Sequence, residues 1–281
     1  MINLIGISGY IGSGKDTVGK IIQYLDGKLK EEKSSLGLGA KFFIPNFQYI
    51  SFEDWRKPKI HESGHDIGNS SMYEIHPNNW QIKKFAYKVK QIASILTGIP
   101  AEKFEDQEFK KSFLVKEWNY IKKDWEGVKP FGKEIEFEKQ MTGREFLQRL
   151  GTDAIRNQLH PNTWVNALFA DYKGYAVDYR EKGNDGLYPK ETNFPNWIIT
   201  DVRFPNEAKA IKERGGVVIR VNRDECVTGT FAIDYLGNKR KSNLHESEVA
   251  LDDWEFDYII NNNGTIEQLI VKVKDLLKEL P

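Results

Sequence analysis

The sequence contains Leu4-Ile5-Gly6-Ile7-Ser8-Gly9-Tyr10-Ile11-Gly12-Ser13-Gly14-Lys15-Asp16-Thr17, and the helix-like run Val18-Gly19-Lys20-Ile21-Ile22 follows it. An apolar strand that passes through a glycine-rich loop into a helix is the context that a phosphate-binding loop of the pattern Gly-x-x-x-x-Gly-Lys requires. Its glycines let backbone N–H groups turn toward a polyphosphate, and the helix adds its N-terminal amides and positive dipole end. The candidate nucleotide-binding residues are Gly9, Gly12, Ser13, Gly14, Lys15, Asp16 and Thr17. The alternative is an ordinary glycine-rich turn between a strand and a helix.

The residue after Lys15 departs from the usual pattern, which has Ser or Thr there to hold Mg²⁺. Here that position is Asp16, and Thr17 follows it. A carboxylate is a hard-oxygen ligand that suits Mg²⁺ directly or through water. An aspartate also favours the N-terminus of a helix electrostatically. The two roles are compatible, and the sequence leaves both open.

Composition limits the classes of function. The chain has 281 residues, of which 40% are hydrophobic, enough for one enlarged domain or two small ones. Its 41 basic and 41 acidic residues balance, so the overall charge indicates neither nucleic acid nor membrane as a partner. The single cysteine, Cys226, cannot form an intrachain disulfide and fits a reducing compartment. No signal peptide and no apolar run near the ~20 residues of a membrane span is found, so we expect an intracellular, cytoplasmic protein.

Short apolar strands alternate with helical patterns along the chain. Strands are expected near residues 4–8, 80–86, 197–201, 217–221 and 256–260. Helices are expected from Thr17 to about Gly27, over 89–96, from Thr142, over 164–169, from Pro205 to Gly215, and from Thr265. The helix after Thr142 opens with a capping box to Glu145, and its expected apolar face contains Phe146, Leu147, Leu150 and Ala154. This alternation predicts an α/β fold with a parallel sheet in three layers.

Three segments interrupt this alternation. Residues 28–79 and 101–140 are predicted to be insertions outside the core, and 173–195 a loop. His61, His65 and His76 fit no zinc-binding spacing. Residues 222–250 carry basic side chains and then His245-Glu246-Ser247-Glu248, so this segment could close over a triphosphate like a lid or be a solvated charged loop.

The second strong signal is Thr200-Asp201-Val202-Arg203-Phe204-Pro205. Ligands of open parallel sheets bind at the carboxyl ends of the strands, so Asp201 is expected near Lys15, where it suits Mg²⁺ or its water shell. Arg203 would lie at the same edge, and its planar guanidinium suits bidentate binding of a second phosphate. The alternative is a strand-end aspartate that caps a helix and an arginine in solvent.

Three further residues are weaker candidates for substrate binding. Arg144 lies in the first turn of a helix, where a cation is unfavourable unless an anion binds. Lys84 and Phe85 follow the strand near residue 80, where a phosphate could be met and a base could stack. A solvent-exposed arginine and a core phenylalanine are the alternatives.

These motifs together resemble a known family. The matching runs are Gly14-Lys15-Asp16-Thr17, Phe104-Glu105-Asp106-Gln107-Glu108-Phe109-Lys110, Thr142-Gly143-Arg144-Glu145, Leu150-Gly151-Thr152, Thr200-Asp201-Val202-Arg203-Phe204-Pro205-Asn206-Glu207 and Phe256-Asp257-Tyr258-Ile259-Ile260-Asn261-Asn262-Asn263-Gly264. The chain resembles nucleoside monophosphate kinases and, more closely, the phage-type deoxynucleoside monophosphate kinases. The last run is also similar to dephospho-coenzyme A kinases. The likeness covers about residues 1–25 and 80–281, and residues 28–79 match nothing in it.

The resemblance implies a three-layer P-loop NTPase fold with insertions, as a single domain over residues 1–281 with a lid-like segment at 222–250. It implies transfer of a phosphoryl group from ATP·Mg²⁺ to a (deoxy)nucleoside 5′-monophosphate. Lys15 and the loop amides would hold ATP, and Asp16, Thr17 and Asp201 would place magnesium. Arg203 and Arg144 would hold the acceptor phosphate. If a phage encodes the chain, the expected location is the host cytoplasm. No general base is needed, because the acceptor phosphate is the nucleophile.

Two other classes of function stay open from the sequence. One is a P-loop kinase of another small metabolite, such as a coenzyme precursor. The other is a nucleotide-dependent switch or a nucleic-acid-stimulated ATPase, against which the neutral charge and the Gly-Lys-Asp-Thr variant speak. The preferred base and sugar are not readable from the sequence, and a homodimer is left open.

Overall fold

The computed structural model describes residues 2–35, 51–55, 79–126, 132–176, 192–224, 231–233, 239–241 and 246–281. The chain separates into two compact units. Unit 1 comprises Met1–Lys84 and Leu168–Pro281, and unit 2 comprises Phe85–Ala167. The single kinase domain with insertions that the sequence indicates stays a prediction, and the two units are described separately below.

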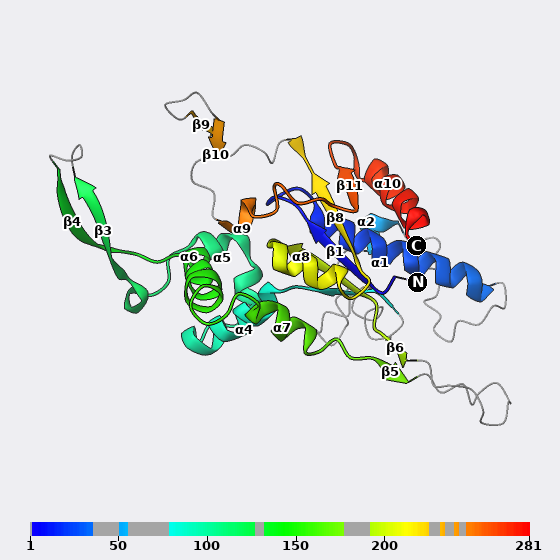
Figure 1. The fold of residues 1–281 in the computed structure, drawn as a ribbon, viewed down its shortest axis with the longest axis horizontal. Helices are drawn as coiled ribbons and strands as arrows, with labels where there is room; N and C mark the ends of the chain where they lie inside the picture. The colour runs from blue at the N-terminus through cyan, green and yellow to red at the C-terminus, as the bar shows by residue number, and fades with distance from the viewer. Residues whose placement is uncertain are drawn as a thin grey trace. The chain divides into compact units, whose positions relative to one another are not determined.

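The centre of unit 1 is a parallel sheet of five strands (Figure 1). The strands are β1 (Leu4–Ser8), β2 (Gln81–Lys83), β7 (Trp197–Val202), β8 (Val217–Asn222) and β11 (Tyr258–Asn261). Their order across the sheet is β11-β8-β1-β7-β2, and every pairing is parallel. β1, β7 and β8 are almost entirely buried, as expected for strands covered on both faces. The predicted α/β fold with a parallel sheet is confirmed.

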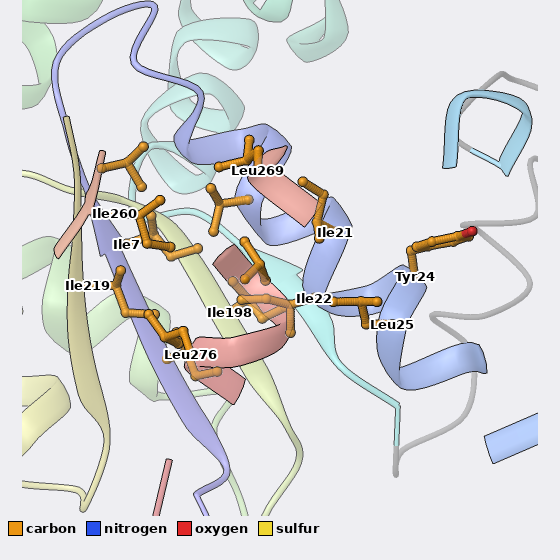
Figure 2. Packing of buried hydrophobic residues seen from close by; sticks show 14 of the residues in the cluster. Ile7, Ile21, Ile22, Tyr24, Leu25, Ile198, Ile219, Ile260, Leu269 and Leu276 are labelled. Carbon is orange, nitrogen blue, oxygen red and sulfur yellow. The ribbon is translucent and has the colours of Figure 1, made fainter. Parts of the chain in front are cut away.

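Helices cover both faces of this sheet. α1 (Lys15–Ser35) and α10 (Ile266–Glu279) pack on one face, where their apolar side chains form a cluster with Ile5 and Ile7 of β1. Figure 2 shows Ile7 within this cluster. α8 (Pro205–Lys212) packs on the other face. The evidence is Gly6, which lies between Ile5 and Ile7: a Cβ on it would lie 2.6 Å from the side chain of Ile211 in α8. The alternation of side chains along β1 therefore produces the predicted three layers.

Most predicted helix ends agree with the structure. Thr265 and Gln268 form the reciprocal capping box that opens α10, and α8 ends before Gly215, whose φ of 75° suits glycine. The end of α1 near Gly27 is wrong, since the helix continues to Ser35. Residues 28–33 are mostly Lys and Glu, which favour helix enough to outweigh one glycine. No helix in the described part of the chain is long and apolar enough to cross a membrane.

Unit 1 also contains short elements outside the sheet. These are α2 (Phe52–Trp55), β5 (Tyr175–Ala176), β6 (Thr192–Asn193), β9 (Phe231–Ile233), β10 (Lys239–Lys241) and α9 (Glu246–Val249). Phe52 is 3% exposed and contacts the ring of Tyr24 edge-on, so residues 28–79 do contribute to the core, contrary to the sequence prediction. The rest of that segment, with His61, His65 and His76, lies outside the described residues, as does Cys226.

Unit 2 is built from short helices and one long hairpin. Its helices are α4 (Ala86–Thr97), η2 (Ala101–Glu105), α5 (Gln107–Lys111), η3 (Lys116–Trp118), α6 (Gly143–Gln148), the π-helix η4 (Arg149–Arg156) and α7 (Thr163–Phe169), which continues into unit 1. The hairpin is β3 (Tyr120–Glu126) with β4 (Lys133–Lys139). Its core gathers Ala93, Phe104, Leu114, Met141 and Phe146.

The π-helix corrects the predicted face of the helix after Thr142. Thr142 caps α6 by accepting a hydrogen bond from the N–H of Glu145, and Phe146 is buried as expected. Ala154 is exposed instead, while Arg156 is buried. Because i→i+5 hydrogen bonding widens each turn, the residues after Arg149 no longer follow the 3.6-residue spacing that the prediction assumed.

Candidate active site

The carboxyl ends of three strands meet in unit 1. The register places Ser8 of β1 beside Val202 of β7 on one side and beside Arg220 of β8 on the other. The glycine-rich loop leaves the sheet directly after Ser8, and Asp201 and Arg203 flank Val202. The sheet register therefore brings the two sequence signals, which are almost 190 residues apart, to one edge.

The glycine-rich loop is held in a defined shape. Ser13 donates its N–H to the carbonyl oxygen of Tyr10 (3.1 Å), and its own carbonyl accepts from Nδ2 of Asn262 (2.9 Å). Gly14 has a φ of 95°, and a Cβ there would collide with Nδ2 of Asn262. A Cβ at Gly9 would lie 2.6 Å from the carbonyl oxygen of Val221. Glycine is thus required at both positions for the loop to turn and to approach its neighbours.

Lys15 lies at the base of this loop in a mixed electrostatic environment. Its Nζ is 3.4 Å from the carbonyl oxygen of Tyr10. Burial and the positive charge of Arg203 lower the pKa of Lys15, while Asp16, Glu248 and Asp201 act in the opposite direction. These four charges therefore lie close enough to act on Lys15, and burial is the largest cause of its lowered pKa.

Asp16, the residue that departs from the usual loop pattern, has two partners. Its Oδ1 accepts a hydrogen bond from Oγ1 of Thr200 (2.7 Å) and pairs with Nζ of Lys84 (3.1 Å). Burial tends to raise the pKa of Asp16, but Lys84 and Thr200 outweigh it and hold the pKa below its usual value. The carboxylate therefore stays charged at the N-terminus of α1, and its contact with β7 fixes the start of that helix.

Arg203 at the end of β7 is held by contacts to both its backbone and its side chain. Its N–H and that of Phe204 donate to Oε2 of Glu207 (2.8 and 3.1 Å), which opens α8. Its Nη1 pairs with Oε1 of Glu248 (2.5 Å) and donates to Oγ of Ser247 (3.3 Å). The side chain of Arg203 is 35% exposed, so it is held by these partners and still accessible to a ligand.

A second arginine, which the sequence analysis did not identify as functional, contacts the glycine-rich loop. Arg220 of β8 is 8% exposed, and its guanidinium lies 4.6 Å from the centre of the Tyr10 ring. Its Nη1 donates to Oγ of Ser8 (3.2 Å), and its Nη2 pairs with Oδ1 of Asp252 (3.5 Å). Tyr10 donates its hydroxyl to the same Asp252 oxygen. An arginine inside an apolar strand needs such partners, and that requirement was the signal available in the sequence.

The remaining predicted residues are distributed as follows. Lys84, Thr17 and Asp201 belong to unit 1, and Asp201 is buried. Arg144 and Phe85 belong to unit 2, where Arg144 donates to Oε1 of Gln107 (3.1 Å) and Phe85 is 4% exposed at the start of α4. The side chains of the basic residues of β10 and most of the lid-like segment lie outside the described residues.

The residues around Lys15 fit a nucleotide with its magnesium ion. Ser13 Oγ is fully buried and has no hydrogen-bond partner among the described residues, and it lies inside a loop whose glycines leave room for a close approach. Asp16, Thr17 and Asp201 offer hard-oxygen ligands, although no cluster of three or more His, Cys, Asp or Glu residues suited to a metal exists among the described residues. Mg²⁺ in phosphoryl-transfer sites takes one or two carboxylates and completes its shell with phosphates and water, so a larger cluster is not needed.

Comparisons with known proteins give a consistent result. A model of the deoxynucleotide monophosphate kinase family matches residues 3–273. The deoxynucleotide monophosphate kinase of Enterobacteria phage T4 is 30% identical over 143 residues, which are 51% of this chain and 48% of that protein. The deoxynucleotide monophosphate kinase of Escherichia phage RB69 is 28% identical over 135 residues, covering 48% and 44%. A putative deoxynucleotide monophosphate kinase of Acanthamoeba polyphaga mimivirus is 29% identical over 136 residues, covering 47% and 59%. The chain spans about half the length of the curated relatives it matches.

Proposed function

This chain belongs to the deoxynucleotide monophosphate kinase family, and from this we propose that it transfers the γ-phosphoryl group of ATP to a deoxynucleoside 5′-monophosphate. An oxygen of the acceptor phosphate attacks the γ-phosphorus, the bond from that phosphorus to the β,γ-bridging oxygen breaks, and ADP leaves. The products are ADP and a deoxynucleoside diphosphate. The proposed cofactors are therefore ATP and Mg²⁺, and the substrates are small nucleotides.

The observation that carries this proposal is that Lys15 and Arg203 lie close enough for the charge of one to act on the other. The two residues come from the ends of different strands, and the charge of Arg203 lowers the pKa of Lys15. Carboxylates offset part of this repulsion, and Glu248 pairs with one nitrogen of Arg203. A reaction between two phosphate-bearing substrates gives each of the two cations a phosphate to bind.

Each side chain then has a defined task. The loop amides and Lys15 bind the donor phosphates, and Arg203 binds the acceptor phosphate with its exposed guanidinium edge. Magnesium, when bound near Asp201, Asp16 or Thr17, neutralises charge on the transferred phosphoryl group. No histidine is needed as a general base, because the acceptor phosphate is already ionised at neutral pH. Positioning and charge stabilisation account for the reaction.

Further expectations accompany the proposal. Lys84 is proposed to contact the acceptor nucleotide, and the same role for Arg144 of unit 2 stays a separate prediction. Phe85, which is 4% exposed, fits the core phenylalanine that the sequence left as the alternative. The relatives named above are viral, which favours a location in the host cytoplasm. Assembly as a homodimer is a separate expectation on which the reaction does not depend.

The test is an acceptor panel. The protein is mixed with ATP·Mg²⁺ and each deoxynucleoside and ribonucleoside monophosphate in turn, and diphosphate formation is followed. Diphosphate from at least one deoxynucleotide is expected. Hydrolysis of ATP that is independent of any acceptor, or activity only after DNA is added, would contradict the proposal.

The role of Arg203 is tested separately. In Arg203→Ala the kcat/KM for the acceptor should fall about 100-fold, because a charged hydrogen-bond pair to phosphate is lost. The dissociation constant of ATP, measured by calorimetry without acceptor, should change by less than about threefold. If instead the variant lost only ATP binding, the assignment of Arg203 to the acceptor would be wrong.

A further inference from the structure

One short segment holds both arginines of the site. It runs from Ser247 in α9 to Asp252 in the turn that follows, and we call it the brace. Leu251, which is 2% exposed, anchors it in the protein, and the N–H of Asp252 donates to the carbonyl oxygen of Val249 (3.0 Å). The brace is therefore a fixed element in the described structure of unit 1.

The first arm of the brace contacts Arg203. Glu248 is only 13% exposed and pairs with Nη1, which also donates a hydrogen bond to Oγ of Ser247. Among the residues that the structure describes, the side-chain hydrogen bonds and ion pair of Arg203 all go to Nη1, and none goes to Nη2 or Nε. One edge of the guanidinium is thus fixed by the brace, and the other is free for two parallel hydrogen bonds to a phosphate.

The second arm of the brace contacts the glycine-rich loop. Asp252 accepts from the hydroxyl of Tyr10 and from Nη2 of Arg220, whose guanidinium lies over the Tyr10 ring. The carbonyl of Tyr10 in turn accepts from the N–H of Ser13 and from Nζ of Lys15. Asp252 thus acts on the glycine-rich loop, the proposed binding site of the phosphoryl donor ATP, through Tyr10.

We propose that the brace positions the two substrates independently, with Glu248 orienting Arg203 for the acceptor phosphate and Asp252 fixing Tyr10 and Arg220 for the donor loop. The inference rests on the proposed function, because it assigns the two arms to the two substrates of that reaction. Glu248 and Asp252 are positioning residues, since neither touches the reacting atoms.

An opposite role for Glu248 is chemically conceivable. A carboxylate on Arg203 could occupy the place of the acceptor phosphate and compete with it. The geometry favours positioning, because Glu248 and Ser247 share the single nitrogen Nη1 and leave the bidentate edge open. The two roles predict opposite changes in the KM of the acceptor, so kinetics separates them.

The experiment compares two matched variants of the full chain, Glu248→Gln and Asp252→Asn. Each keeps the shape of the side chain and removes one negative charge from the same segment. Initial rates are measured with the acceptor varied at saturating ATP and with ATP varied at saturating acceptor. Glu213→Gln serves as a control, because it removes a charge from an exposed pair with Lys209.

A crossed result is expected. Glu248→Gln should lower kcat/KM for the acceptor about tenfold and leave the KM of ATP within about twofold. Asp252→Asn should raise the KM of ATP about tenfold and leave the KM of the acceptor within about twofold. In an Arg203→Ala background, Glu248→Gln should have no further effect, which a general loss of structure would not reproduce.

Several outcomes would overturn the inference. A lower acceptor KM with undiminished kcat in Glu248→Gln would show competition instead of positioning. Equal effects on both substrates, or no effect beyond that of Glu213→Gln, would exclude two separate arms. Should Asp252→Asn fail to fold, Tyr10→Phe removes only the hydroxyl that contacts Asp252 and should give the same rise in the KM of ATP.

The failure of the inference can be distinguished from that of the proposed function. If the unaltered protein makes diphosphate but the variants lack the crossed pattern, only the inference is wrong. If the unaltered protein makes no diphosphate with any monophosphate, the proposed function fails and the inference fails with it.

Discussion

Asn262 donates a hydrogen bond of 2.9 Å from Nδ2 to the carbonyl oxygen of Ser13, so the turn after β11 is attached to the middle of the glycine-rich loop. The same nitrogen is the group with which a Cβ at Gly14 would collide. The edge strand of the sheet thus supports the loop from the side, and the support depends on glycine being present. The loop is therefore contacted at Ser13 by Asn262 and at Tyr10 by Arg220.

We predict that Asn262→Ala weakens ATP binding about fivefold, because a hydrogen bond of about 1 kcal/mol that fixes the loop is lost. The measurement is the dissociation constant of ATP by calorimetry. Asn263→Ala is the matched control, since the side chain of Asn263 bonds to Asp224 and not to Ser13, so its loss should leave ATP binding unchanged. Equal weakening in both variants would show that the turn as a whole, and not the contact to Ser13, matters.

ATP affinity should depend on pH through Lys15. Burial and Arg203 lower the pKa of Lys15, so its charge is lost at a lower pH than that of an ordinary lysine. ATP binding without acceptor should therefore weaken as the pH rises toward the alkaline range. In Arg203→Gln the repelling charge is gone, the pKa of Lys15 rises, and the weakening should move to higher pH. An unchanged pH profile in this variant would contradict the closeness of the two cations.

The pair of Lys84 with Asp16 should contribute to stability in a pH-dependent way. The depressed pKa of Asp16 stabilises the fold above the ordinary pKa of aspartate, and this contribution is lost as the pH falls through the folded-state pKa. Lys84→Met should lower the free energy of unfolding by about 0.5 kcal/mol near pH 7, a modest value because both side chains are partly exposed.

The difference between the unaltered protein and Lys84→Met should shrink toward zero in acid, as Asp16 becomes protonated. Urea denaturation at neutral and acid pH measures this difference. Lys209→Met, which breaks an exposed pair with Glu213, is the control for the loss of a surface charge. A difference that stays constant with pH would mean that Lys84 stabilises the protein through packing and not through Asp16.

Local patterns predicted much of the fold. Apolar runs gave the strands at Leu4, Trp197 and Val217, and capping residues gave the starts of helices at Thr142 and Thr265, because each depends on neighbouring residues only. The π-helix after Gln148 was missed, since its i→i+5 hydrogen bonds have no distinct local signature. The continuation of α1 past Gly27 was missed because one glycine was given more weight than the helix-favouring residues after it.

The motifs of the site could be predicted from the sequence, but the contacts between residues that are distant in sequence could not. The glycine-rich loop and the Asp201–Arg203 run carry their chemistry in adjacent residues. Arg220 and Glu248, in contrast, become relevant only through partners that lie far away in sequence. Such pairs depend on the order of strands across the sheet, which places β8 beside β1. A single sequence contains no direct record of that order.

The last prediction concerns Phe52, which comes from a segment that the sequence assigned to an insertion. Phe52 is 3% exposed and its ring lies 5.5 Å from that of Tyr24 on α1. Phe52→Ala should lower the free energy of unfolding by about 3 kcal/mol, because it removes buried apolar surface and leaves a cavity. Ile259→Ala, at a position that is 60% exposed, should change it by less than about 0.5 kcal/mol. If the two substitutions cost the same in urea denaturation, residues 51–55 do not belong to the core of unit 1.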